Sequence, residues 1–158
     1  MRQLSAVVGI SPRRAKRFAN LYRILKATLS ADESVNFVSA DGHGGSYEQA
    51  MILLALTTGA PHAAAKLLTL LTNMADDEVK DQHLVLEMLQ ALTCDADETA
   101  AFKAGRDMMD NALGGTDWSA ALTEFRLWAP RVRRFAFDAS ALRLGARLAA
   151  LGTVQSGP

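Results

Sequence analysis

The segment from residue 49 to residue 65 limits the fold of this chain more than any other feature, because it contains no Asp, Glu, Lys or Arg. A stretch this apolar is expected to be buried, either in a protein core or in a membrane. Gly59-Ala60-Pro61 interrupts it, and neither half has the about 20 residues that a helix needs to cross a bilayer. We therefore expect two buried helices that meet at this break, with the second, at 61–74, as the central helix of the core, and no membrane span.

The rest of the chain also favours helices over strands. Leu and Ala are abundant and β-branched residues are sparse, and only residues 34–38 show a weak strand-like alternation. We expect an all-α fold, a single bundle of about six to seven helices. The expected organisation is a basic N-terminal helical segment at 1–29, a long loop at 30–45, an acidic helical core at 46–129, basic C-terminal helices at 130–152 and a tail at 153–158.

Charge is segregated along the sequence although the formal net charge is zero. Residues 1–31 contain seven basic and no acidic residues, a charge of +7. Residues 32–124 contain sixteen acidic and four basic residues, a charge of −12, and the remainder carries +5. Such blocks indicate either that the two basic ends share a type of partner, or that they pair with the acidic middle within one fold. In the first case, the acidic middle is a candidate surface for protein partners.

The most regular pattern lies in residues 12–29. Ser11-Pro12 is a typical helix start, since Ser can cap the helix and Pro is tolerated at its first position. Apolar residues then recur at steps of three and four, which predicts one buried stripe on a helix of about five turns. The stripe consists of Ala15, Phe18, Tyr22, Leu25 and Leu29.

The opposite side of this predicted helix is basic. At 100° per residue, one arc of about 120° holds only cations and one amide, with Arg14 near its border. The arc consists of Arg13, Lys16, Arg17, Asn20 and Arg23. Like charges on adjacent turns repel one another, so an anionic ligand is one interpretation, and a solvated face is the other. A turn at Gly9 before this helix also resembles a helix-turn-helix DNA-binding unit, although no third helix precedes it and the apolar spacing is longer than a recognition helix needs.

Two segments resemble KAP-family P-loop NTPases. The first is S-P-R-x-x-K-R-F-x-N-x-Y-R at residues 11–23, which is similar to the segment that follows the nucleotide-binding core in that family. The second is W-x-P-x-V-R-R-F-x-F at residues 128–137, which resembles a sequence near the C-terminal end of those proteins. The matching positions are Pro12, Phe18, Asn20, Tyr22 and Arg23 with the basic residues between them, and Trp128, Pro130, Arg133, Arg134 and Phe135.

The resemblance implies a helical lid that closes over bound ATP. It implies that Arg13, with Lys16 and Arg17 as alternates, contacts the terminal phosphates, while Asn20 and Arg23 hold a neighbouring subdomain. Guanidinium suits this role because it presents paired donors and stays charged. The chain has no Gly-x-x-x-x-Gly-Lys-[Ser/Thr] motif, so we expect no catalysis from it alone and ATP binding only together with a P-loop core, in cis or in trans.

Alternative functions remain open. The chain could bind DNA through the basic helix, or it could be a non-catalytic helical adaptor that binds a basic protein through its acidic middle. His43, His62 and His83 have no ligand spacing for a metal, and Cys94 has no adjacent base. The single cysteine and the absence of a signal-peptide pattern favour a cytoplasmic protein.

Overall fold

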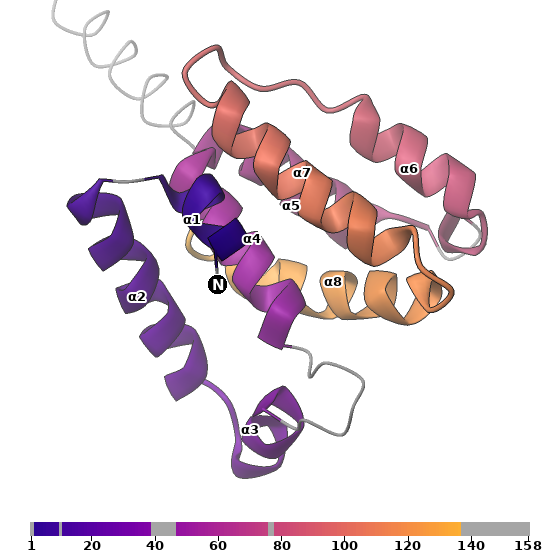
Figure 1. Cartoon of the computed structure of the whole chain (residues 1–158). Helices are drawn as coiled ribbons and strands as arrows, with labels where there is room; N and C mark the ends of the chain where they lie inside the picture. The colour runs from indigo at the N-terminus through magenta and orange to yellow at the C-terminus, as the bar shows by residue number, and fades with distance from the viewer. Residues whose placement is uncertain (1, 10, 39–46, 76–77, 137–158) are drawn as a thin grey trace, which may run out of the picture.

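The computed structural model describes residues 2–9, 11–38, 47–75 and 78–136. These residues form eight α-helices, one short 3₁₀ helix and no strand, packed in one bundle (Figure 1). The all-α prediction is confirmed. In chain order the elements are α1 Arg2–Val8, α2 Pro12–Ala27, α3 Ala31–Val38, α4 Tyr47–Gly59, α5 Pro61–Asn73, η1 Glu78–Lys80, α6 Gln82–Gln90, α7 Thr99–Leu113 and α8 Trp118–Arg133.

Helix α4 is the centre of the bundle. It packs against α1, α2, α5, α7 and α8, and every residue from Ile52 to Gly59 is buried. The prediction that 61–74 would be the central helix is wrong: α5 buries one face only and leaves Lys66 exposed. Neither helix has a charged residue between positions 49 and 65, but α4 has no polar face after its first turn, which is what a helix enclosed by neighbours requires.

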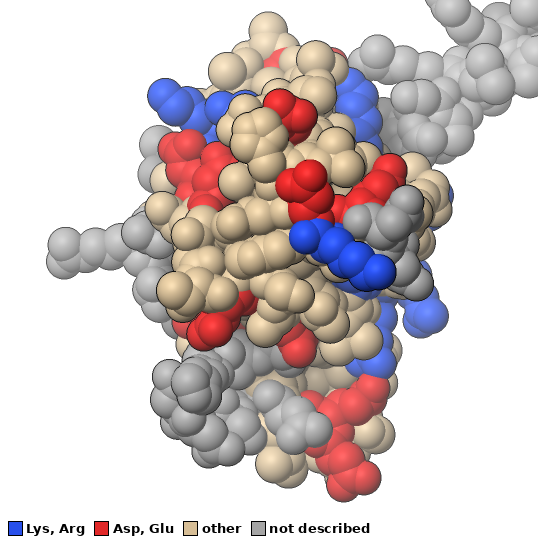
Figure 2. All heavy atoms as spheres, turned by 90° about the vertical axis from the view of Figure 1, so that its right-hand side faces the viewer, with Lys and Arg blue, Asp and Glu red and all other residues tan. Residues whose placement is uncertain are grey.

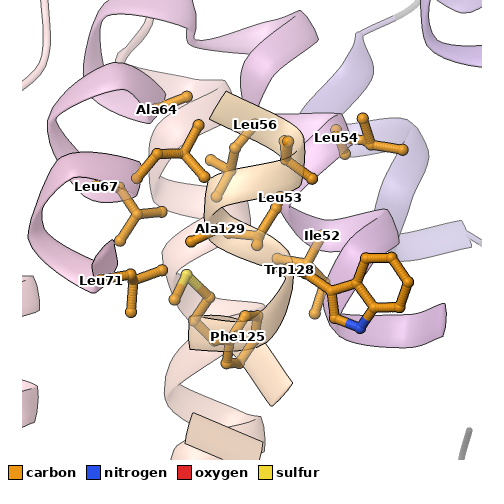
Figure 3. Packing of buried hydrophobic residues seen from close by; sticks show 14 of the residues in the cluster. Ile52, Leu53, Leu54, Leu56, Ala64, Leu67, Leu71, Phe125, Trp128 and Ala129 are labelled. Atoms are coloured by element: carbon orange, nitrogen blue, oxygen red, sulfur yellow. The ribbon is translucent and has the colours of Figure 1, made fainter. Parts of the chain in front are cut away.

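The core is built where α4, α5 and α8 meet (Figure 3). Leu53, Leu54 and Leu56 of α4 are at most 1% exposed, and Leu67 and Leu71 of α5 are equally buried. From α8, Phe125, Trp128 and Ala129 close the third side. Each buried leucine removes enough apolar surface from water to contribute about 1.5–3 kcal/mol, so this contact region is the main source of stability.

Two glycines allow α1 and α7 to pack closely against α4. A Cβ at Gly59 would lie 1.9 Å from the backbone oxygen of Val7, so α1 can pass the end of α4 only because this position has no side chain. A Cβ at Gly105 in α7 would lie 2.3 Å from Cδ2 of Leu56. These contacts fix α1 and α7 on the central helix, and α1 leads directly into α2.

The expected long loop at 30–45 is wrong in its first half. Residues 31–38 form α3, and the strand-like alternation at 34–38 is part of this helix. The cause is a reciprocal cap: the backbone N–H of Glu33 donates to Oγ of Ser30 at 3.2 Å, and the N–H of Ser30 donates to the Glu33 carboxylate at 2.9 Å. Residues 39–45 lie outside the described residues.

Helix α8 also differs from its expectation. A boundary was expected after Ala129, but the helix continues through Pro130 to Arg133. Proline lacks an N–H and removes one bond to the preceding turn. Pro130 is exposed and lies in the last turn of α8, while Ala129 and Val132 on either side remain buried and hold the turn in place. The expected helix up to residue 152 and the tail at 153–158 lie outside the described residues.

The bundle has two opposite edges. Helices α2 and α3 form one edge and α6 lies at the other, with α4 between them (Figure 1). In the described part of the chain, no helix combines the length and the apolar character that crossing a bilayer would require.

Candidate functional site

Helix α2 starts as its sequence predicts. Gly9 has φ of +80°, a conformation that L side chains rarely adopt, and this turns the chain out of α1. Ser11 is extended at the cap position and Pro12 is the first helical residue, although the Ser11 hydroxyl makes no capping bond. At the other end, Oγ1 of Thr28 donates to the carbonyl of Leu25 at 2.7 Å. The local signals therefore define both ends of the helix.

The apolar stripe of α2 docks its second half on the bundle. Leu25 is 1% exposed, and Phe18, Tyr22 and Leu29 are partly buried against the core. Ala15, which was predicted to belong to this stripe, is exposed, as is the whole first turn at 12–16. The N-terminal turns of α2 therefore offer their side chains to solvent on more sides than a docked helix normally does.

The basic face of α2, defined as Arg13, Lys16, Asn20 and Arg23, is exposed at all four positions. Within the described residues, none of its three cations forms an ion pair with a carboxylate. The possibility that the basic N-terminal segment pairs with the acidic middle of the same fold thus fails for these residues. Three uncompensated charges remain available to an anion.

Two other arginines of the helix behave differently. Arg17 is half-buried and has an interaction within the protein, so it belongs to the packing of α2 rather than to its free face. Arg14 is exposed, and its guanidinium lies over the preceding turn, with Nη1 3.5 Å from the position that a Cβ of Gly9 would occupy. Of the predicted phosphate-binding residues, Arg13 and Lys16 are therefore the free cations.

One of the two acidic residues in the first turn of α3, Glu33, is compensated. Glu33 of α3 accepts a hydrogen bond from Arg131 of α8. This bond, together with the N–H of Ser30, lowers the pKa of Glu33 from 4.5 to about 2. Its charge is thus balanced by Arg131, whereas the neighbouring Asp32 is exposed, as is Glu48 beside Tyr47, whose ring packs on Phe37.

The second predicted motif surrounds Trp128. Its ring is 3% exposed, and the guanidinium of Arg131 lies 5.1 Å from the ring centre. Pro130, Arg133 and Arg134 are exposed, and Phe135 is half-buried against the core.

The structure brings the two predicted motifs together through a residue that the sequence analysis missed. The ring of Phe37 in α3 lies 6.3 Å from Tyr22 of the first motif and 5.1 Å from Trp128 of the second. Phe37 is 1% exposed, so the three rings form one packed joint between α2, α3 and α8. The available signal was the capping pattern Ser30-x-x-Glu33, which predicts a helix where a loop was expected.

A second polar cluster was also missed. Glu98 is 3% exposed and accepts hydrogen bonds from the backbone N–H groups of His62 and Ala63, each at 3.1 Å. Nδ1 of His62 lies 2.7 Å from the same carboxylate and 3.3 Å from Asp95. Because Ala60 at the cap position of α5 has no side-chain acceptor, Glu98 supplies the cap from a distant part of the chain. The role of this cluster is therefore structural: it caps the start of α5.

The other candidate residues in the described part of the chain lie apart from one another. His83 is exposed and lies 3.5 Å from Glu87 in the same helix, and Sγ of Cys94 lies 3.8 Å from the Thr99 hydroxyl. His43 lies outside the described residues. The described residues contain no group of three or more His, Cys, Asp or Glu that could hold a metal ion.

The sequence and structure together establish an all-helical domain with an exposed basic face at one edge. Comparison with known proteins found no matching family model, no matching curated protein and no matching solved structure. The likeness to KAP-family NTPases consequently depends on the two short segments described above.

Proposed function

We propose that this chain is a non-catalytic helical module that contacts phosphate groups through the basic face of α2. The observation that supports this most is the exposure of Arg13, Lys16 and Arg23 without a carboxylate partner among the described residues. A protein surface usually mixes both signs of charge, whereas this helix face carries three cations and no acid, an arrangement that a bound anion would stabilise.

The resemblance to KAP-family NTPases suggests the source of the phosphate. In that form of the proposal, a separate P-loop core holds the nucleotide, and this chain closes over it with Arg13 directed at the terminal phosphates. Two features support it: the first turn of α2 is exposed on all sides, and the joint at Phe37 ties both motif segments into one unit. A bidentate guanidinium contact would then report the presence of the terminal phosphate.

The distribution of charge favours a defined orientation on such a ligand. Figure 2 shows the side of the bundle that carries α6, opposite α2, where carboxylates and lysine or arginine side chains are interspersed. The exposed acids on and near α6 and α7 include Asp81, Glu87, Asp95 and Asp107. A phosphate-rich partner would be attracted to the unmixed cations of the α2 edge rather than to this side, where the charges are mixed.

The proposal can be tested by titrating the isolated ¹⁵N-labelled protein with ATP at low salt and following backbone amide shifts. We expect millimolar binding, because without a core only the α2 cations contribute, and shifts confined to the first half of α2. The Arg13→Ala/Lys16→Ala variant should lose these shifts. Lys103→Ala, which removes an exposed cation from α7, is the matched control and should retain them. Shifts of equal size elsewhere on the bundle, or none at α2, would refute the proposal.

A further inference from the structure

We propose that the basic face of α2 and the C-terminal end of α8 form one continuous surface that binds the phosphate backbone of a nucleic-acid duplex. This rests on the proposed phosphate-binding function and names the class of ligand. The cations involved are Arg13, Lys16 and Arg23 of α2 with Arg133 and Arg134 at the end of α8, and all five are exposed.

The joint at Phe37 connects the helices that carry these two groups of cations. Tyr22, adjacent to Arg23, packs on Phe37 at 6.3 Å, and Phe37 packs on Trp128 at 5.1 Å. Arg133 and Arg134 follow Trp128 by five and six residues, about one and a half helical turns. The last turns of α8 are therefore linked to the middle of α2 through α3, although more than a hundred residues separate them in the sequence.

The ion pair between Arg131 and Glu33 neutralises one of the carboxylates near the end of α8. Glu33 would otherwise present an uncompensated carboxylate next to the last turn of α8. Arg131 binds it through a charge-assisted hydrogen bond. Arg131 is thereby used within the fold, while Arg133 and Arg134 form no ion pair with the rest of the described chain.

The length of the surface favours an extended polyanion over a single nucleotide. Arg13 and Arg23 are ten residues apart, which corresponds to about 15 Å along a helix at 1.5 Å per residue. A triphosphate can meet one end of this row, whereas a duplex, with a charge every about 1.7 Å along its axis, supplies phosphates along all of it. Duplex phosphates would also reach the end of α8.

The chemistry of the surface favours the backbone over the bases. Guanidinium and ammonium groups bind phosphate oxygens regardless of sequence, and Asn20 is the one amide in the exposed row on α2. The apolar side of α2 is docked on α4, and exposed Asp32 follows the end of the helix, so insertion of α2 along its length into a groove would bring a carboxylate to the phosphates. We therefore infer binding across the backbone with little sequence preference.

The test is fluorescence anisotropy of the full chain with a labelled 20-base-pair duplex, measured from about 50 to 200 mM salt. Five phosphate contacts predict a slope of log K against log salt of about −4.5. Arg13→Ala/Lys16→Ala and, independently, Arg133→Ala/Arg134→Ala should each reduce its magnitude by about 2. Lys103→Ala should leave it unchanged. All substituted residues are exposed, and circular dichroism checks that the variants fold.

The outcomes separate this inference from the proposed function. If only the α2 variant changes the slope, the composite surface is wrong and phosphate binding by α2 stands. If the duplex does not bind at 50 mM salt while ATP still shifts the α2 amides, the ligand class is wrong. If neither ligand responds to the α2 substitutions, both proposals fail. Equal competition by polyglutamate, or a tenfold preference between duplex sequences, would also contradict a phosphate-backbone surface.

Discussion

Replacing Gly59 by alanine tests whether α1 is held against the end of α4 as the structure shows. The added Cβ would start 1.9 Å from the carbonyl oxygen of Val7, and real Cβ contacts essentially never fall below 3.0 Å. The two backbones would have to separate by more than 1 Å. No rotamer change can relieve the contact, because the opposing atom belongs to the main chain.

The expected loss of stability follows from two opposing effects. Overpacking costs about 1–3 kcal/mol, and the contact with a rigid backbone places Gly59→Ala toward the upper end. The better helix propensity of alanine returns up to about 1 kcal/mol, which leaves a net loss of about 2 kcal/mol. For a chain of this length that lowers the melting temperature by about 4–8 °C.

Urea denaturation followed by circular dichroism measures this change. The midpoint should fall by about 1 M with an unchanged slope. The matched control is Gly115→Ala, since a Cβ there would meet nothing within 4 Å, and it should be neutral or stabilising by up to about 1 kcal/mol. If Gly59→Ala were as stable as the unmodified protein, the close approach of α1 and α4 would be wrong, and with it the anchoring of the turn into α2.

Three further predictions concern the acidic residues. Glu98→Gln should destabilise the fold by about 1–3 kcal/mol in thermal or urea melts, because an amide cannot accept both backbone N–H groups and the His62 contact as a carboxylate does; an unchanged midpoint would show that α5 does not need this cap. The pKa of the Glu33 carboxyl should be about 2 by NMR and should return toward 4.5 in Arg131→Ala. The stability that Arg131 confers is therefore present above pH 4.5 and is lost as the pH falls toward 2. An identical titration of Glu33 in both proteins would exclude the ion pair. Asp110→Asn should stabilise the protein at neutral pH, because burial raises the pKa of Asp110 and the ionised carboxylate therefore destabilises the folded state above its normal pKa. The gain should shrink in melts at acidic pH, where Asp110 is protonated in both states. A gain independent of pH would contradict burial of the charge as its cause.

The parts of the fold that were predictable are those with local signals. Ser11-Pro12 and Pro61 mark helix starts because the capping residue and the proline act within one turn. The exposure of Arg13 and Lys16 follows from helical spacing alone. These inferences need no knowledge of which segments pack together.

The parts that were not predictable depend on contacts between distant segments. The choice between α4 and α5 as the central helix was partly readable, because α5 has one apolar face whereas α4 does not, but the neighbours that enclose α4 were not. Glu98 caps α5 from 36 positions away, and α8 continues through Pro130 because buried neighbours hold its last turn. The joint at Phe37 likewise exists only in the folded chain, since it joins α2, α3 and α8.

The most direct test of the central claim, that the free cations at the start of α2 meet phosphate, is reversal of their charge. Arg13→Glu/Lys16→Glu should leave the helical content unchanged, since both side chains are exposed and without ion-pair partners in the described structure. Its affinity for the labelled duplex at 50 mM salt should fall at least tenfold, which corresponds to about 1.4 kcal/mol. An affinity within twofold of the unmodified protein would contradict the account.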